Sequence, residues 1–236
     1  EKDSDHVSIV GNYIGNCAEN PIIFNGASGQ TIGDAVVSGN KVDFSGIDAV
    51  KLTYVVGGAV TGNLIKNGGA NGGTYSAILV DNSSGIAVSD NRCFDDNAST
   101  TQDYGLSVTG TSSNLTISGN DFSGNVTGEL TMSGTPTSMH FTPRNGLGTA
   151  IVAAATIAIP TDGTVFHVTG NTNITNGITV NPWDNGRTVL LIFDSTPTVS
   201  DTGTSVLSAA YVTTASDTLT LVCDGTNWYE LGRSAN

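Results

Sequence analysis

Charged side chains are scarce in this sequence of 236 residues and make up 12% of it. Lys and Arg together number 8, against 21 Asp and Glu, so the net charge is −13. Nucleic acids and anionic lipid surfaces require a basic footprint that this chain lacks. The charge balance excludes nucleic acid as a partner and permits neutral or cationic ones, glycans among them. The same acidity also serves to keep a β-rich surface soluble.

Cysteine and long apolar runs are equally sparse. The three cysteines match no metal motif, and their odd number argues against a disulfide framework. Cys93 and Cys223 fall at apolar positions of strand patterns, which predicts small buried residues. No apolar run reaches about 18 residues, so no membrane insertion is expected. No nucleophile elbow, phosphate loop or zinc spacing occurs, so neither a cofactor nor a metal is predicted.

Glycine and β-branched residues are abundant, and five asparagines stand at regular intervals within strand-like patterns. Their spacings are 28, 23, 28 and 29 residues. An apolar residue, or Cys93, lies three positions before and two positions after each asparagine, and Gly or Asp stands directly before it. A period of this length indicates a solenoid. The asparagines are Asn12, Asn40, Asn63, Asn91 and Asn120.

The flanking apolar residues are five positions apart, so they share an inner side only if the chain bends between them. Gly before the asparagine supplies the unusual backbone angles of such a corner. Stacked at about 4.8 Å per rung, the five amides would form a hydrogen-bonded ladder. A third strand follows each corner, as in "PIIFNG" and "YSAILV". We therefore predict an all-β chain whose residues 1–138 form a parallel β-helix, right-handed and with three strands per rung.

The asparagine pattern stops after Gly134, and a different alternation begins near Ala150. Segments such as "GTVFHVTG" and "GRTVLLIFD" alternate with period two between Asp, Asn, Gly and Pro turns. We predict that residues 139–236 form an antiparallel β-sandwich that caps the β-helix. The repeat is already under way at Val7, so residues 1–138 are interpreted as the C-terminal rungs of a longer helix.

The C-terminal segments "GRTVLLIFDSTPTV" (186–199) and "DTLTLVCDGTNWYELGR" (217–233) resemble the C-terminal sandwich of bacteriophage tailspikes and tail appendages. In that family the sandwich follows a right-handed β-helix. The resemblance implies a homotrimer on the virion, in the phage tail, that binds host cell-surface polysaccharide. Many members of the family also cleave the polysaccharide.

Carboxylates are the candidates for cleavage, because glycoside hydrolysis uses a pair of them about 5 Å or about 6.5–9.5 Å apart. Asp43 follows one corner asparagine, and Asp95 and Asp96 follow another two rungs further on. Stacking predicts an outward pair formed by Asp43 with Asp95 or Asp96. Each of these residues alone is equally typical of a solvated turn.

Aromatic faces commonly pack against sugars, and Tyr54, Tyr75 and Tyr104 lie near the ends of third strands. Tyr75 and Tyr104 occupy matching positions in the sequence alignment of two repeats. They would line a shallow groove or simply stack along the ladder. Trp228 or its neighbour is predicted to lie in the core of the C-terminal half.

Three functions remain open: a tailspike fragment that binds and possibly cleaves polysaccharide, a non-catalytic attachment fibre, and a secreted polysaccharide lyase. The lyase is the least favoured, because it needs basic residues near an acidic metal site. Low charge in residues 150–236 favours a trimer contact there. The charged residues of this stretch are Asp162, Asp184, Arg187, Asp194, Asp201, Asp217, Asp224, Glu230 and Arg233.

Overall fold

The computed structural model describes residues 4–97, 99, 101–143 and 145–235. Strands and turns make up this described part of the chain, which contains no helix and hence none that could cross a membrane. The chain divides into two compact units, Glu1–His140 and Phe141–Asn236.

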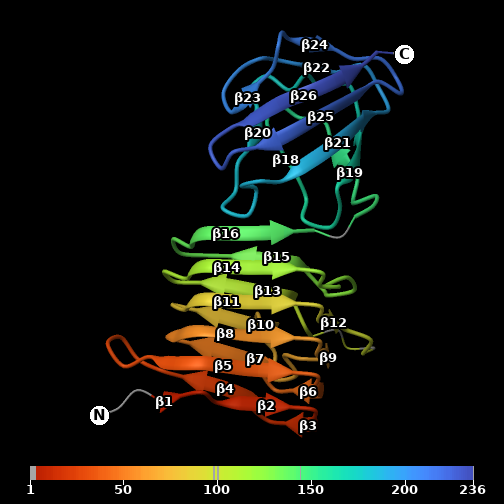
Figure 1. Cartoon of the computed structure of the whole chain (residues 1–236). Helices are drawn as coiled ribbons and strands as arrows, with labels where there is room; N and C mark the ends of the chain where they lie inside the picture. The colour runs from red at the N-terminus through yellow and green to blue at the C-terminus, as the bar shows by residue number, and fades with distance from the viewer. Residues whose placement is uncertain (1–3, 98, 100, 144, 236) are drawn as a thin grey trace. The chain divides into compact units, whose positions relative to one another are not determined.

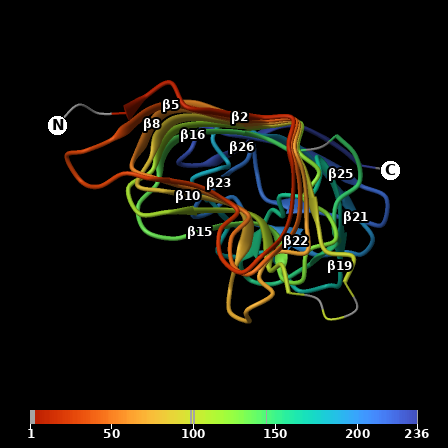
Figure 2. The ribbon, with the colours of Figure 1, turned by 90° about the horizontal axis from the view of Figure 1, so that it is seen from below.

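The first unit is a β-solenoid of about seven turns, built from three parallel sheets whose strands stack from turn to turn (Figure 1). The first sheet contains β1 (Ser4–Asp5), β2 (Ser8–Val10), β5 (Ile32–Ser38), β8 (Val55–Thr61), β11 (Ser84–Ser89), β14 (Ser113–Ser118) and β16 (Thr137–Thr142). The second contains β4 (Ile22–Asn25), β7 (Val50–Thr53), β10 (Ser76–Asp81), β13 (Tyr104–Thr109) and β15 (Gly128–Met132). The third contains β3 (Tyr13–Cys17), β6 (Lys41–Ser45), β9 (Leu64–Lys66) and β12 (Arg92–Phe94). Figure 2 shows β2, β5, β8 and β16 overlapping when the solenoid is viewed along its axis.

Alternation along each strand separates an apolar interior from a polar exterior. In β10, Ile78 and Val80 are fully buried, whereas Leu79 and Asp81 between and after them are partly exposed. Ile78 pairs with Val50 on one side and with Leu106 on the other, so like residues stack inside. Cys93 is fully buried in the same way, as the sequence predicts. The core is thus a set of apolar columns that run from turn to turn.

The five asparagines form a continuous hydrogen-bonded ladder at the corner between the first and third sheets. Each Nδ2 donates to Oδ1 of the asparagine in the next turn, at 2.8–3.1 Å. The same Oδ1 also accepts the backbone N–H of the preceding asparagine at 2.9–3.0 Å. The second Nδ2 proton goes to a carbonyl oxygen, which for Asn91 is that of Val60 at 2.8 Å. Each internal amide is therefore satisfied although it is almost completely buried.

The residue before each asparagine has a left-handed backbone, with φ between 56° and 69°. Four of these residues are glycines, and Asp90 is the exception. A second left-handed column crosses the first sheet and was not predicted from the sequence. Register places Asp34, Gly57, Gly85 and Asn114 side by side, all with positive φ. Asn, Asp and Gly tolerate this conformation best, so the column bends every strand of the sheet at one level.

The second unit is built around a six-stranded sheet in the order β17-β19-β21-β25-β26-β23. These strands are β17 (Ile151–Val152), β19 (Val165–Thr169), β21 (Thr188–Phe193), β25 (Thr218–Cys223), β26 (Trp228–Ser234) and β23 (Ser205–Val206). Two further pairs accompany the sheet: β18 (Ile157–Ala158) with β20 (Ile178–Thr179), and β22 (Thr198–Val199) with β24 (Tyr211–Val212).

The prediction of purely antiparallel pairing in the second unit is wrong. The β17–β19, β19–β21 and β23–β26 pairs are parallel, and only β21–β25 and β25–β26 are antiparallel within this sheet. Parallel neighbours require a crossover connection, and the segment between β19 and β21 provides one that includes β20. Period-two alternation is the same for both strand directions, so the pattern could not reveal this.

One apolar core fills the second unit, and Trp228, Phe166 and Phe193 lie at full burial within it. The Trp228 indole Nε1 donates to the Thr179 carbonyl oxygen at 3.1 Å, which satisfies its single polar atom. Cys223 is 1% exposed in the same core. The sequence predictions for Trp228 and Cys223 are therefore confirmed.

Candidate functional site

Asp43 and Asp96, two of the predicted catalytic carboxylates, meet on the outer face of the third sheet. Asn67 Nδ2 donates to Asp43 Oδ1 at 3.1 Å and to Asp96 Oδ1 at 2.8 Å. Lys66 Nζ lies 3.5 Å from Asp43 and 3.0 Å from Asp96. The two carboxylates are thus close enough to act as a pair, but an ammonium and an amide lie between them.

The electrostatics of this cluster do not suit general acid catalysis. Hydrogen bonds from Asn67 and then from Lys66 lower the pKa of Asp96, while the hydrogen bond to Asp96 raises the pKa of Lys66. A glycosidase needs one carboxyl group that stays protonated, which requires a raised pKa. The charges of Lys66 and Asp96 instead stabilise each other, as in a structural ion pair.

Asp95 does not join this pair. Its Oδ2 accepts the backbone N–H groups of Thr101 and Gln102, at 2.6 Å and 2.8 Å. Its Oδ1 accepts the backbone N–H of Asn97 at 2.9 Å. Both oxygens therefore hold the loop that follows β12, and the prediction of Asp95 as a partner of Asp43 is not supported by this geometry.

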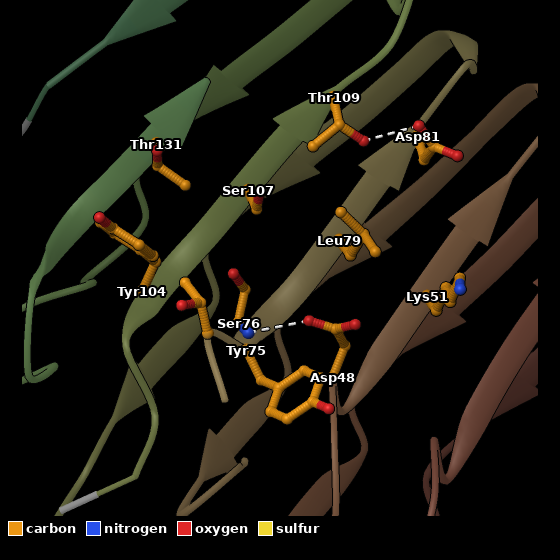
Figure 3. A pocket seen from close by; sticks show the side chains of 11 residues that line it. Asp48, Lys51, Tyr75, Ser76, Leu79, Asp81, Tyr104, Ser107, Thr109 and Thr131 are labelled. Carbon is orange, nitrogen blue, oxygen red and sulfur yellow. Dashed lines mark hydrogen bonds between the residues drawn. The ribbon is translucent and has the colours of Figure 1, made fainter. Parts of the chain in front are cut away.

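A groove of about 380 Å³ lies on the outer face of the second sheet, over β7, β10, β13 and β15 (Figure 3). Tyr75 and Tyr104, two of the predicted sugar-binding residues, line it. The other lining residues are Asp48, Lys51, Thr74, Ser76, Leu79, Asp81, Ser107, Thr109 and Thr131. The groove thus combines aromatic rings with hydroxyls, carboxylates and one ammonium group.

The two tyrosines do not occupy matching positions in the sheet. Tyr104 pairs with Ser76, not with Tyr75, because β10 and β13 are offset by 28 residues. The corner that follows β13 holds one residue more, which restores the 29-residue offset seen at Ser84 and Ser113. A slip of one residue reverses the face of a strand, so the rings line the groove from different positions instead of stacking.

Tyr54, the third predicted sugar-binding residue, is not among the residues that line the groove. It lies between β7 and β8 with a left-handed backbone, at φ 51°. Asn82 occupies the next turn at the equivalent position with φ 47°. Tyr54 is therefore a corner residue, and its place in the fold does not bring it to the same surface as Tyr75.

Asp48 is the groove residue that the sequence did not reveal. Its side chain is 8% exposed, and Oδ1 accepts the backbone N–H of Ser76 at 2.8 Å. Burial raises the pKa of Asp48. The signal available in the sequence was its distance of 28 residues from Ser76, which the repeat places in the next turn. Read alone, an Asp directly before a strand looks like an ordinary turn residue.

Asp48 and Asp81 cannot act together as a glycosidase pair. Register places Asp48 opposite Ser76, and Asp81 lies five residues further along β10. Five residues of extended strand span about 17 Å, well beyond the separation of either hydrolytic mechanism. Among the described residues, no group of three His, Cys, Asp or Glu side chains is arranged to hold a metal ion.

Comparisons with models of protein families, with curated proteins and with solved structures return no match for this chain. Its function is therefore argued from the groove and the solenoid alone.

Proposed function

We propose that this chain belongs to a host-attachment appendage of a bacteriophage tail and binds host surface polysaccharide in the groove over the second sheet. The proposal includes the right-handed coil expected from the crossover rule and a sandwich-type C-terminal domain. One observation carries it: an elongated outer sheet face presents two tyrosine side chains among hydrogen-bonding groups.

Sugar recognition typically needs such a combination, because apolar ring faces pack against aromatics and hydroxyls seek polar partners. Thr109 Oγ1 donates to Asp81 Oδ1 at 2.6 Å, which fixes that carboxylate at one end of the groove. Tyr75 and Asp48 lie toward the other end (Figure 3). The strands beneath are rigid and parallel, so these groups are held in fixed positions without loop closure.

Binding without cleavage is the form of this function that the geometry favours. The Asp43–Asp96 pair is occupied by Lys66, and Asp48 is too far from Asp81. We therefore favour the non-catalytic attachment fibre over a depolymerase. A lyase is also disfavoured, because the groove holds one basic side chain, Lys51, among its lining residues.

Calorimetry against a panel of capsule and O-antigen polysaccharides tests this function. We expect a ligand whose affinity falls about tenfold in Tyr104→Ala and in Tyr75→Ala, the loss of roughly 1.4 kcal/mol of contact energy. The bound polysaccharide should keep its length after prolonged incubation. Tyr13→Ala is the matched control, because Tyr13 is 68% exposed on the third sheet and should leave affinity unchanged.

Equal affinity of the groove variants and of the Tyr13 control would remove the groove from the proposal. Release of oligosaccharides by the wild-type chain would show instead that the appendage is a depolymerase.

The second unit is proposed to assemble the chain as a homotrimer. Alternate residues of β21 and β25 lie in the core, while Leu190, Ile192 and Val222 face the other side of the sheet. Three of the nine charged residues between 150 and 236 are buried, namely Asp184, Arg187 and Asp217. The outer face is thus even poorer in charge than the sequence suggests, as is typical of a subunit contact.

Light scattering on the full chain tests the assembly. A trimer of this 24.0-kDa chain is expected at micromolar concentration. Replacing Leu190 and Ile192 together by Lys should yield a folded monomer, because three copies of each charge would meet in the contact. A wild-type chain that elutes with the mass of one copy would end the trimer proposal without affecting the groove.

A further inference from the structure

The electrostatics of the groove identify the class of glycan that it accepts. This inference rests on the proposed function, since it concerns the same groove. Three of the lining side chains carry charge: the carboxylates of Asp48 and Asp81 and the ammonium of Lys51. Asp103, whose Oδ2 accepts the backbone N–H of Tyr75 at 3.2 Å, adds a third carboxylate beside the tyrosines. Uronic acids and other anionic sugars would meet repulsion here.

Asp48 provides the second, independent observation. Its side chain is more than nine-tenths buried, yet one of its oxygens is left for a ligand. Oδ1 accepts the Ser76 N–H, and Figure 3 draws no hydrogen bond to the other oxygen from the lining residues. That oxygen points away from Ser76, on the groove side of the sheet (Figure 3).

Lys51 does not neutralise this group directly. Within the described residues, no ion pair joins Lys51 to Asp48 or to Asp81, although Lys51 is near enough to lower the pKa of Asp48 slightly. Desolvation outweighs that influence, so the carboxyl group lacks polar neighbours. A cationic ligand group would supply the missing hydrogen-bond donor and the missing charge together.

We propose that the groove binds a polysaccharide containing amino sugars with free amines, and that Asp48 receives the ammonium group while Tyr75 packs against the same sugar. The net charge of −13 draws such a chain toward the protein from a distance. An N-acetylated sugar of the same backbone would keep the contact with the ring but lose the ion pair.

Three oligosaccharides of equal length separate the possibilities: a chitosan oligomer with free amines, its fully N-acetylated counterpart, and an oligogalacturonate. We expect the free amine form to bind at least about tenfold more tightly than the acetylated form, the effect of one charge-assisted hydrogen bond. The oligogalacturonate should show no binding.

Asp48→Asn is the decisive variant, because the amide oxygen can still accept the Ser76 N–H and preserve the turn. It should abolish the preference for free amines and leave the affinity for the acetylated oligomer unchanged, which also shows that the groove is folded. Asp34→Asn is the control with the same change of charge. Asp34 is exposed on the first sheet at φ 47°, a conformation that Asn tolerates, so the preference should persist in this variant.

Equal affinity for the free and acetylated forms, or an undiminished preference in Asp48→Asn, would overturn the inference and leave the proposed function intact. An equal loss of preference in Asp34→Asn would show that the net charge of the protein, not Asp48, attracts the amine. Failure of every neutral and amine-bearing glycan to bind in a manner that depends on Tyr104 would count against the proposed function itself.

Discussion

Replacing Asn91 by Leu is expected to lower the free energy of unfolding by about 3–5 kcal/mol, because several buried partners lose hydrogen bonds at once. Asn91 is 1% exposed, and its Oδ1 accepts both the backbone N–H and the Nδ2 of Asn63. Its Nδ2 donates to Asn120 Oδ1 and to the Val60 carbonyl oxygen. Leu can neither accept nor donate, so at least the Asn63 N–H and the Val60 oxygen stay buried without a partner.

Asn12→Leu is the matched control for this substitution. Asn12 occupies the same position in the first turn, but it is exposed, so water can replace its hydrogen bonds. We expect a loss of about 1 kcal/mol or less there. Denaturant unfolding of both variants gives the comparison. Similar losses at the two sites would mean that burial of the ladder does not matter, and no loss at Asn91 would contradict its role in holding the turns together.

Arg187→Met should destabilise the second unit by about 3–5 kcal/mol, the cost of leaving a buried charge without its counterion. Arg187 Nη1 donates to Asp184 Oδ1 at 2.6 Å, and the side chains are 1% and 0% exposed. Nη2 also donates to the Pro160 carbonyl oxygen at 2.7 Å. Burial raises the pKa of Asp184 and lowers that of Arg187, so desolvation opposes their attraction.

Removing both charges should therefore cost less than removing one. The double variant Asp184→Asn, Arg187→Met is expected to recover about half of the loss, since Asn can still cap the turn through Asn181. Arg92→Met is the control, because Arg92 contacts Asp121 at the same 2.6 Å but is 56% exposed. A loss below about 1 kcal/mol is expected there. Additive effects of the two single substitutions would show that the buried charges are not coupled.

The solenoid and its asparagine corners could be predicted because they repeat. Each corner places the same demands on the chain: Gly or Asp with a left-handed backbone, then Asn, with apolar residues on both sides. One repeat alone would not have distinguished Asn91 from a loop residue. The requirement to satisfy a buried amide explains why the same residue recurs in every turn.

The candidate site was predicted only in part, because binding surfaces do not repeat. Tyr75 and Tyr104 were recognised as groove residues, but their register was wrong by one residue. An extra residue in the corner after β13 compensates for the 28-residue offset of the strands, and a sequence alignment without gaps conceals it. Asp48 was missed because its burial depends on the neighbouring turn, which no local pattern shows.

Amide chemical shifts during titration with the polysaccharide test the central claim most directly, because they show where on the solenoid the glycan binds. We expect the largest changes in β7, β10 and β13 and in the residues that precede them, including Asp48, Tyr75 and Tyr104. Changes centred on Asp43 and Asp96 on the third sheet, or confined to the second unit, would contradict the assignment of the groove as the binding site.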